Sequence, residues 1–183
     1  VGRYIGPKLR INKVAQNNLL IAFPEKKSKE IEIDLSKMWD NLGRTAFEST
    51  MLEKFDCSKS SNRITINGID EIIKLNQNNS SILFFSGHLA NWDLMPLTLS
   101  QNNIEAAFIY RAANNKLVNS IIVKSRKTIS KIQIPKGLQG ARKIIKLIKQ
   151  GKNIAMLVDQ KQNDGISVPF FHKQTMTAPA IAN

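Results

Sequence analysis

The chain has 183 residues, enough for one domain with a sizeable core but few for two. Its composition, 42% hydrophobic and 22% charged, argues against a disordered or fibrous protein, and a single cysteine excludes an intramolecular disulfide framework and a cysteine-based zinc site. No apolar run approaches the roughly 18 residues that span a bilayer, so no segment of this sequence is expected to cross a membrane.

The net charge of +13 is concentrated in the C-terminal half. Residues 1–100 contain 13 Lys and Arg against 11 Asp and Glu, a difference of +2, whereas residues 101–183 contain 14 against 3, a difference of +11. No acidic residue lies between Glu105 and Asp159. This asymmetry predicts an anionic partner: nucleic acid, anionic lipid or an acidic protein. A solvated, lysine-rich face is the alternative interpretation.

The N-terminal part of the chain is predicted to be mainly helical, because its apolar residues recur at helical spacing. The elements expected there are a helix over residues 3–22, a helix from an N-cap at Asp34 to about residue 55, a strand over residues 63–67 and a helix over residues 69–75.

Strands and helices alternate from residue 82 onward. Strands are expected over residues 82–85, 104–110, 154–158 and 168–171, and helices over residues 92–99, 117–129 and 138–148. This alternation predicts an α/β fold with a largely parallel or mixed central sheet flanked by helices, and a helical N-terminal section. We expect residues 1–183 to form a single domain, a fragment of a longer protein, because the sequence opens without Met and stops where a new helix begins.

His88 and Asp93 follow the first buried strand in the stretch "SGHLANWDLM". Five residues along one helix are about 140° off the same face, so the two side chains can meet only if the chain turns between them. Gly87 and an N-cap at Asn91 would supply that turn and leave Asp93 in the first helical turn. His88 would then be a general base with Asp93 as its orienting carboxylate. The alternative is a purely structural role for both residues, with a histidine that ends a strand and an aspartate that caps a helix.

"GHLANWD" resembles the His-x4-Asp/Glu motif of the bacterial lipid A late acyltransferases, lauroyl and myristoyl transferases of the glycerolipid acyltransferase superfamily. Other segments resemble that family in the same order: "NNLLIAFPE" (17–25), "NLGRTAFE" (41–48), "IYR" (109–111), "AMLVDQ" (155–160) and "VPFFHKQTMTAPAIA" (168–182). A lone His-x4-Asp would be a weak signal, but the combination is specific.

The resemblance implies transfer of a fatty acyl group from an acyl-acyl carrier protein to a hydroxyl of a lipid A precursor, with no metal or cofactor. His88 and Asp93 would be the catalytic pair. The candidate substrate-binding residues are Asn91, Trp92, Arg111, Asp159 and Gln160. Arg111 would hold a phosphate or developing negative charge, although a surface arginine at a strand end is an equal alternative. A turn-capping role is nearly as well supported for Asp159.

The sequence departs from the family pattern at several positions. Leu89 and Ala90 replace a common Phe-Gly, His172 stands where the family usually has glycine, and residues 178–180 read Ala-Pro-Ala rather than Gly-Pro-Ala. These differences leave the acyl-chain length and the acceptor open. We treat His172 as a loop residue rather than a second base.

The resemblance also implies a location at the cytoplasmic face of the bacterial inner membrane, peripheral for this fragment, with an N-terminal anchor and a C-terminal segment outside the sequence. The basic C-terminal half fits an acidic carrier protein, an anionic membrane surface and an anionic lipid. Two alternatives remain: an acyltransferase acting on another phospholipid or glycolipid, and a basic nucleic-acid-binding module. The second rests on charge alone and lacks a recognition signature, so no nucleic acid is expected.

Overall fold

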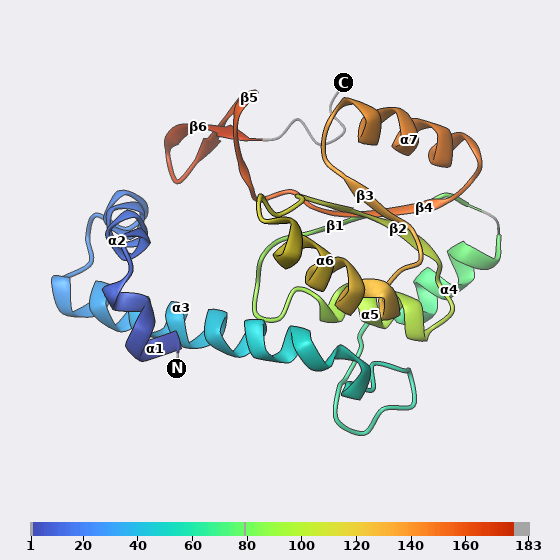
Figure 1. The fold of residues 1–183 in the computed structure, drawn as a ribbon, viewed down its shortest axis with the longest axis horizontal. Helices are drawn as coiled ribbons and strands as arrows, with labels where there is room; N and C mark the ends of the chain where they lie inside the picture. The colour runs from blue at the N-terminus through green and yellow to red at the C-terminus, as the bar shows by residue number, and fades with distance from the viewer. Residues whose placement is uncertain (1, 79, 178–183) are drawn as a thin grey trace. The chain divides into compact units, whose positions relative to one another are not determined.

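The computed structural model describes residues 2–78 and 80–177, which belong to two compact units (Figure 1). One unit combines residues 2–48 with residues 160–177, and the other contains residues 49–159 apart from residue 79. Among the described residues, no helix is both long and apolar enough to cross a bilayer.

The unit of residues 49–159 is built on a four-stranded parallel sheet in the order β1-β4-β2-β3. Its strands are β1 (Leu83–Ser86), β2 (Ala106–Tyr110), β3 (Gln133–Pro135) and β4 (Asn153–Leu157). Its helices are η2 (Ser49–Lys54), α4 (Ile69–Gln77), α5 (Leu94–Gln101), α6 (Lys116–Ser125), η3 (Arg126–Thr128) and α7 (Leu138–Lys149). The predicted α/β class with a largely parallel sheet is confirmed.

Helices cover both faces of this sheet, with α7 on one side and α4, α5 and α6 on the other (Figure 1). Alternate residues of β4 face opposite layers: Ile154 and Met156 pack with Leu147 of α7, whereas Ala155 packs with Leu99 of α5. Both faces of the inner strand are therefore buried, which explains why β4 reads as a continuous apolar run. All four strands end at the same edge, where open parallel sheets place their ligands.

The other unit joins the N-terminal helices to a β-hairpin of the C-terminal part of the chain. Its elements are α1 (Gly2–Ile5), η1 (Gly6–Lys8), α2 (Ile11–Ala22), α3 (Ser28–Glu48), β5 (Lys161–Phe170) and β6 (Lys173–Thr177). Trp39 of α3 is buried against Gly6, where a Cβ atom would lie 2.0 Å from the indole ring, and its Nε1 donates to Asn12 at 2.7 Å. The strands β5 and β6 pair antiparallel, and Phe171 between them contacts Phe23 edge to face.

Three N-terminal predictions are wrong in detail. The helix expected over residues 3–22 is interrupted at η1, where Pro7 stands, and resumes at Ile11. Asp34 is not an N-cap, because α3 begins six residues earlier, and its carboxylate instead pairs with Lys26 at 2.6 Å. The α-helix also ends at Glu48, before a 3-10 segment.

The strand expected over residues 63–67 does not form. Ile64 and Ile66 still pack against two different hydrophobic clusters. The alternating apolar pattern therefore reflects the burial of these two side chains, although the segment pairs with no strand. The sequence pattern does not predict two of the strands: β3, which has three residues and ends in a proline, and β6, whose one apolar residue is Met176. The last predicted strand, residues 168–171, is the end of a longer strand, β5.

Candidate active site

His88 contacts Asp159 across the carboxyl ends of two adjacent strands. Ser86 of β1 and Leu157 of β4 are register partners, so the loops that follow them leave the sheet side by side. The backbone N–H of His88 donates to Asp159 Oδ2 at 2.6 Å, and the ring Nδ1 lies 2.7 Å from Oδ1. The sheet thus joins two residues that are 71 positions apart in sequence.

The Asp159 carboxylate determines which imidazole nitrogen is basic. Burial raises the pKa of Asp159, but the hydrogen bonds from the backbone and ring of His88 outweigh burial and leave that pKa below its usual value of 3.8. The carboxylate is therefore ionised near neutral pH and can only accept, so Nδ1 carries the proton and Nε2 is the basic nitrogen. Gly87 allows this approach, because a Cβ there would lie 3.1 Å from Asp159 Oδ2.

The chain turns between Gly87 and Asp93, as the sequence predicts. Ala90 occupies the left-handed region with φ of 45°. Asn91 Oδ1 accepts a hydrogen bond from the Asp93 backbone N–H at 3.1 Å, and α5 begins at the next residue. The predicted N-cap is therefore wrong: Asn91 holds the turn just before the helix, and the N-cap is Asp93, which precedes the first helical turn instead of lying in it.

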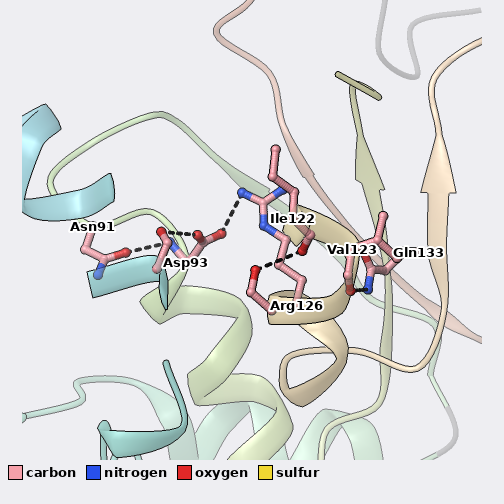
Figure 2. A network of polar contacts seen from close by, with 8 residues as sticks. Asn91, Asp93, Ile122, Val123, Arg126 and Gln133 are labelled. Carbon is pink, nitrogen blue, oxygen red and sulfur yellow. Dashed lines mark hydrogen bonds and ion pairs between the residues drawn. The ribbon is translucent and has the colours of Figure 1, made fainter. Parts of the chain in front are cut away.

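Asp93 is buried and forms an ion pair with a residue that the sequence did not single out. The whole residue is 4% exposed. Its Oδ1 lies 2.9 Å from an Arg126 guanidinium nitrogen, and its Oδ2 accepts a hydrogen bond from the Ser49 hydroxyl at 2.9 Å. Figure 2 shows the Asp93 carboxylate directed toward Arg126, with Asn91 beside it. These contacts tie the start of α5 to η2 and η3. That Asp93 orients His88 remains a prediction.

An apolar cavity of about 50 Å³ lies next to the His88 loop. Trp92 connects the two features, because its ring contacts the His88 ring edge to face at 5.0 Å between centroids and also lines the cavity. The other lining residues are Asp93, Met95, Pro96, Phe108, Ile109, Arg126, Ile129, Ser130, Gln133, Met156 and Leu157. The volume holds about three to five water-sized groups, which suits a short segment of an aliphatic chain.

The structure brings some of the remaining predicted residues to this edge. Arg111 directly follows β2, and Lys136, which the sequence did not mark, directly follows the neighbouring β3. Gln160 belongs to the other unit, where its backbone carbonyl accepts a hydrogen bond from the Thr177 hydroxyl. Its role in substrate binding remains a prediction. Among the described residues, no three His, Cys, Asp or Glu side chains gather where they could hold a metal ion.

Comparison with known protein families assigns the chain. The model of the bacterial lipid A biosynthesis acyltransferases matches residues 1–183. The chain belongs to this family. It is a transferase of acyl groups in lipid A, and hence lipopolysaccharide, biosynthesis, with a lipid A-type acceptor. Comparison with curated proteins finds no match.

Two departures from the family pattern fall on unusual backbone conformations. Ala90 in the His88 loop and His172 between β5 and β6 both have positive φ, 45° and 59°. The resemblance described in the sequence analysis places glycine at both positions. Glycine adopts this region without the steric cost that a Cβ imposes, so the family's preference has a local physical reason. His172 lies in a tight turn, in agreement with its interpretation as a loop residue.

Proposed function

We propose that the chain transfers a fatty acyl group from an acyl-acyl carrier protein to a hydroxyl of a lipid A precursor, with His88 as the general base. The observation that carries this proposal is the His88 and Asp159 pair at the carboxyl edge of the sheet. It supplies a basic imidazole nitrogen with a fixed tautomer, and the apolar cavity beside Trp92 supplies space for part of an acyl chain.

The chemistry requires one proton carrier and no covalent enzyme intermediate. Nε2 of His88 accepts the proton of the acceptor hydroxyl as its oxygen attacks the thioester carbonyl carbon. The resulting oxyanion collapses, the carbon–sulfur bond breaks, and the thiolate takes the proton from the imidazolium. The products are an ester and the free thiol of the carrier protein, and His88 returns to its neutral form.

We assign different tasks to the two aspartates. Asp159 holds the ring through Nδ1 and stabilises the imidazolium that forms during proton transfer. Asp93, the motif aspartate, holds the loop and the start of α5 through Arg126 and Ser49. The motif predicts direct orientation of His88 by Asp93, so the two variants Asp159→Asn and Asp93→Asn distinguish the assignments.

We further propose that the protein works at the cytoplasmic face of the inner membrane. Leu117 and Ile121 of α6 are 75% and 64% exposed, and they lie one turn apart. Lysines 116, 124 and 127 accompany them and are also exposed. An exposed apolar pair among lysines suits an anionic lipid surface or an acidic carrier protein, and each lysine near an anionic surface contributes about 1 kcal/mol.

The proposal is tested with the purified protein, an acyl-acyl carrier protein and a lipid A precursor, with products read by mass spectrometry. We expect an acylated precursor from the unmodified protein and none from His88→Ala. The matched control is His172→Ala, because these are the chain's two histidines and His172 lies in the hairpin turn. Near-normal transfer by a folded His88→Ala protein would refute the base assignment.

The acceptor is tested in parallel with the donor fixed. A lipid A precursor, a glycerophospholipid and an unrelated glycolipid are offered in separate reactions. Preferential acylation of a lipid other than the lipid A precursor would contradict the proposed acceptor while leaving the role of His88 intact. The nucleic-acid-binding alternative rests on positive charge alone.

A further inference from the structure

Two cationic side chains begin at the same level of the sheet edge that carries His88. Tyr110 of β2 and Pro135 of β3 are register partners, and the backbone N–H of Lys136 donates to the Tyr110 carbonyl at 2.9 Å. Arg111 and Lys136 are the next residues of their two strands. Their backbones therefore leave the sheet side by side, beyond the carboxyl ends of parallel strands.

The charges at this edge influence one another. Partial burial of Lys136 lowers its pKa, the positive charge of Arg111 lowers it further, and the negative charge of Asp159 raises it. These three groups thus lie close enough to interact electrostatically, and Asp159 also contacts His88. Two like charges that begin at neighbouring strand ends favour a bound anion, because its charge would relieve their repulsion.

We propose that Lys136 joins Arg111, for which the family resemblance already implies such a role, in binding a phosphate group of a substrate beside His88. The planar guanidinium of Arg111 can hold two phosphate oxygens, and the Lys136 ammonium can act as a point charge on the third. The placement beside a reacting hydroxyl or thioester rests on the proposed function. Two sources share this chemistry: a phosphate on the lipid acceptor and the phosphodiester that links a carrier protein to its thiol arm.

Binding is tested without catalysis, with inorganic phosphate as the probe. In a His172→Ala background, His88 is the one imidazole left, so its ring protons give an unambiguous NMR signal. We expect phosphate to shift this signal saturably at constant ionic strength and pH, whereas chloride does not. Lys136→Gln should raise the apparent Kd about tenfold, the effect of one hydrogen bond between charged groups.

Lys131 provides the matched control. It is exposed and precedes β3, whereas Lys136 follows it, so the two lysines lie at opposite ends of the same strand. Lys131→Gln removes the same charge and should change the Kd less than twofold, and Lys136→Arg should remain within threefold of the unmodified protein. Equal weakening by Lys131→Gln and Lys136→Gln, or no saturable shift with phosphate, would overturn the proposal.

Transfer assays identify the source of the phosphate and separate this proposal from the proposed function. If the acceptor supplies the phosphate, Lys136→Gln raises the KM about tenfold for a phosphorylated acceptor and leaves it unchanged for the dephosphorylated one. If the donor supplies it, the same contrast appears between acyl-phosphopantetheine and acyl-pantetheine. A Lys136→Gln defect that persists on both dephosphorylated substrates refutes the phosphate site, whereas phosphate binding without any acyl transfer refutes only the proposed function.

Discussion

Replacing Asp93 with asparagine removes one charge from a buried ion pair while keeping the shape of the side chain. Arg126 is left with a side chain only 27% exposed and no longer opposed by the Asp93 charge at 2.9 Å, and the Ser49 hydrogen bond loses its charged acceptor. Breaking a buried pair costs about 3–5 kcal/mol. Because the guanidinium partly reaches water, we expect the free energy of unfolding to fall by about 2–3 kcal/mol.

The comparison variant is Asp40→Asn, which removes the same charge from an exposed helical pair. Asp40 and Arg44 lie 3.0 Å apart but are 48% and 68% exposed, so the loss should be below about 0.5 kcal/mol. Urea unfolding followed by circular dichroism measures the free energy of unfolding of both variants. In thermal unfolding, Asp93→Asn should lower the Tm by roughly 4–12 °C. Equal destabilisation by the two variants would refute the reasoning.

The same Asp93→Asn protein also tests the motif. Assayed well below its Tm, it should retain most of its kcat if Asp93 only holds the loop. A loss of a hundredfold or more in a folded protein would instead show that Asp93 orients His88.

Three further predictions concern Asp159, Ala90 and Cys57. Asp159→Asn should lower kcat about a hundredfold or more, because the ring loses its orienting carboxylate. The pKa of Asp159 is lowered in the folded protein, so its contacts with His88 stabilise the fold above pH 3.8, and this stabilisation is lost as the pH falls through the folded-state pKa. A pH series of unfolding measurements would show this loss. Ala90→Gly should raise the free energy of unfolding by about 0.5–1 kcal/mol, because relief of the positive φ exceeds the entropy cost of glycine; a decrease would contradict this. Burial raises the pKa of the Cys57 thiol, so a thiol reagent should modify it only after urea unfolds the protein, and rapid modification of the native protein would refute its burial.

Strong hydrophobic periodicity made much of the fold predictable. The inner strand β4 and the amphipathic helix α7 were placed within one residue at each end, because burial of these elements requires uninterrupted apolar patterns. The strands β3 and β6 carry little apolar signal: β3 is three residues long, and β6 has Met176 as its one apolar residue. Their formation depends on partner strands that no local pattern reveals.

The candidate site was predictable by residue type but not by pairing. His88, Asp93 and Asp159 were all singled out, yet sequence spacing favours partners that are near in the chain. The strand order decides otherwise, because it places the end of β4 beside the end of β1 and brings Asp159 to the imidazole. Lys136 was not predictable as a residue of this edge, because it follows β3, for which the sequence gives no strand signal.

The position of β1 at the edge of the sheet has a consequence for synthesis of the chain on the ribosome. In the sheet β1 pairs with β4, and residues 153–157 are translated about seventy residues after it. Until then the nascent segment that carries His88 has a strand without its native neighbour, the kind of unpaired edge that promotes aggregation. Pairing with β4 covers one side of β1 and delivers Asp159 in the same step. The contact between the imidazole and Asp159 therefore forms only after β4 has joined the sheet, so a chain that ends before β4 lacks this part of the candidate site.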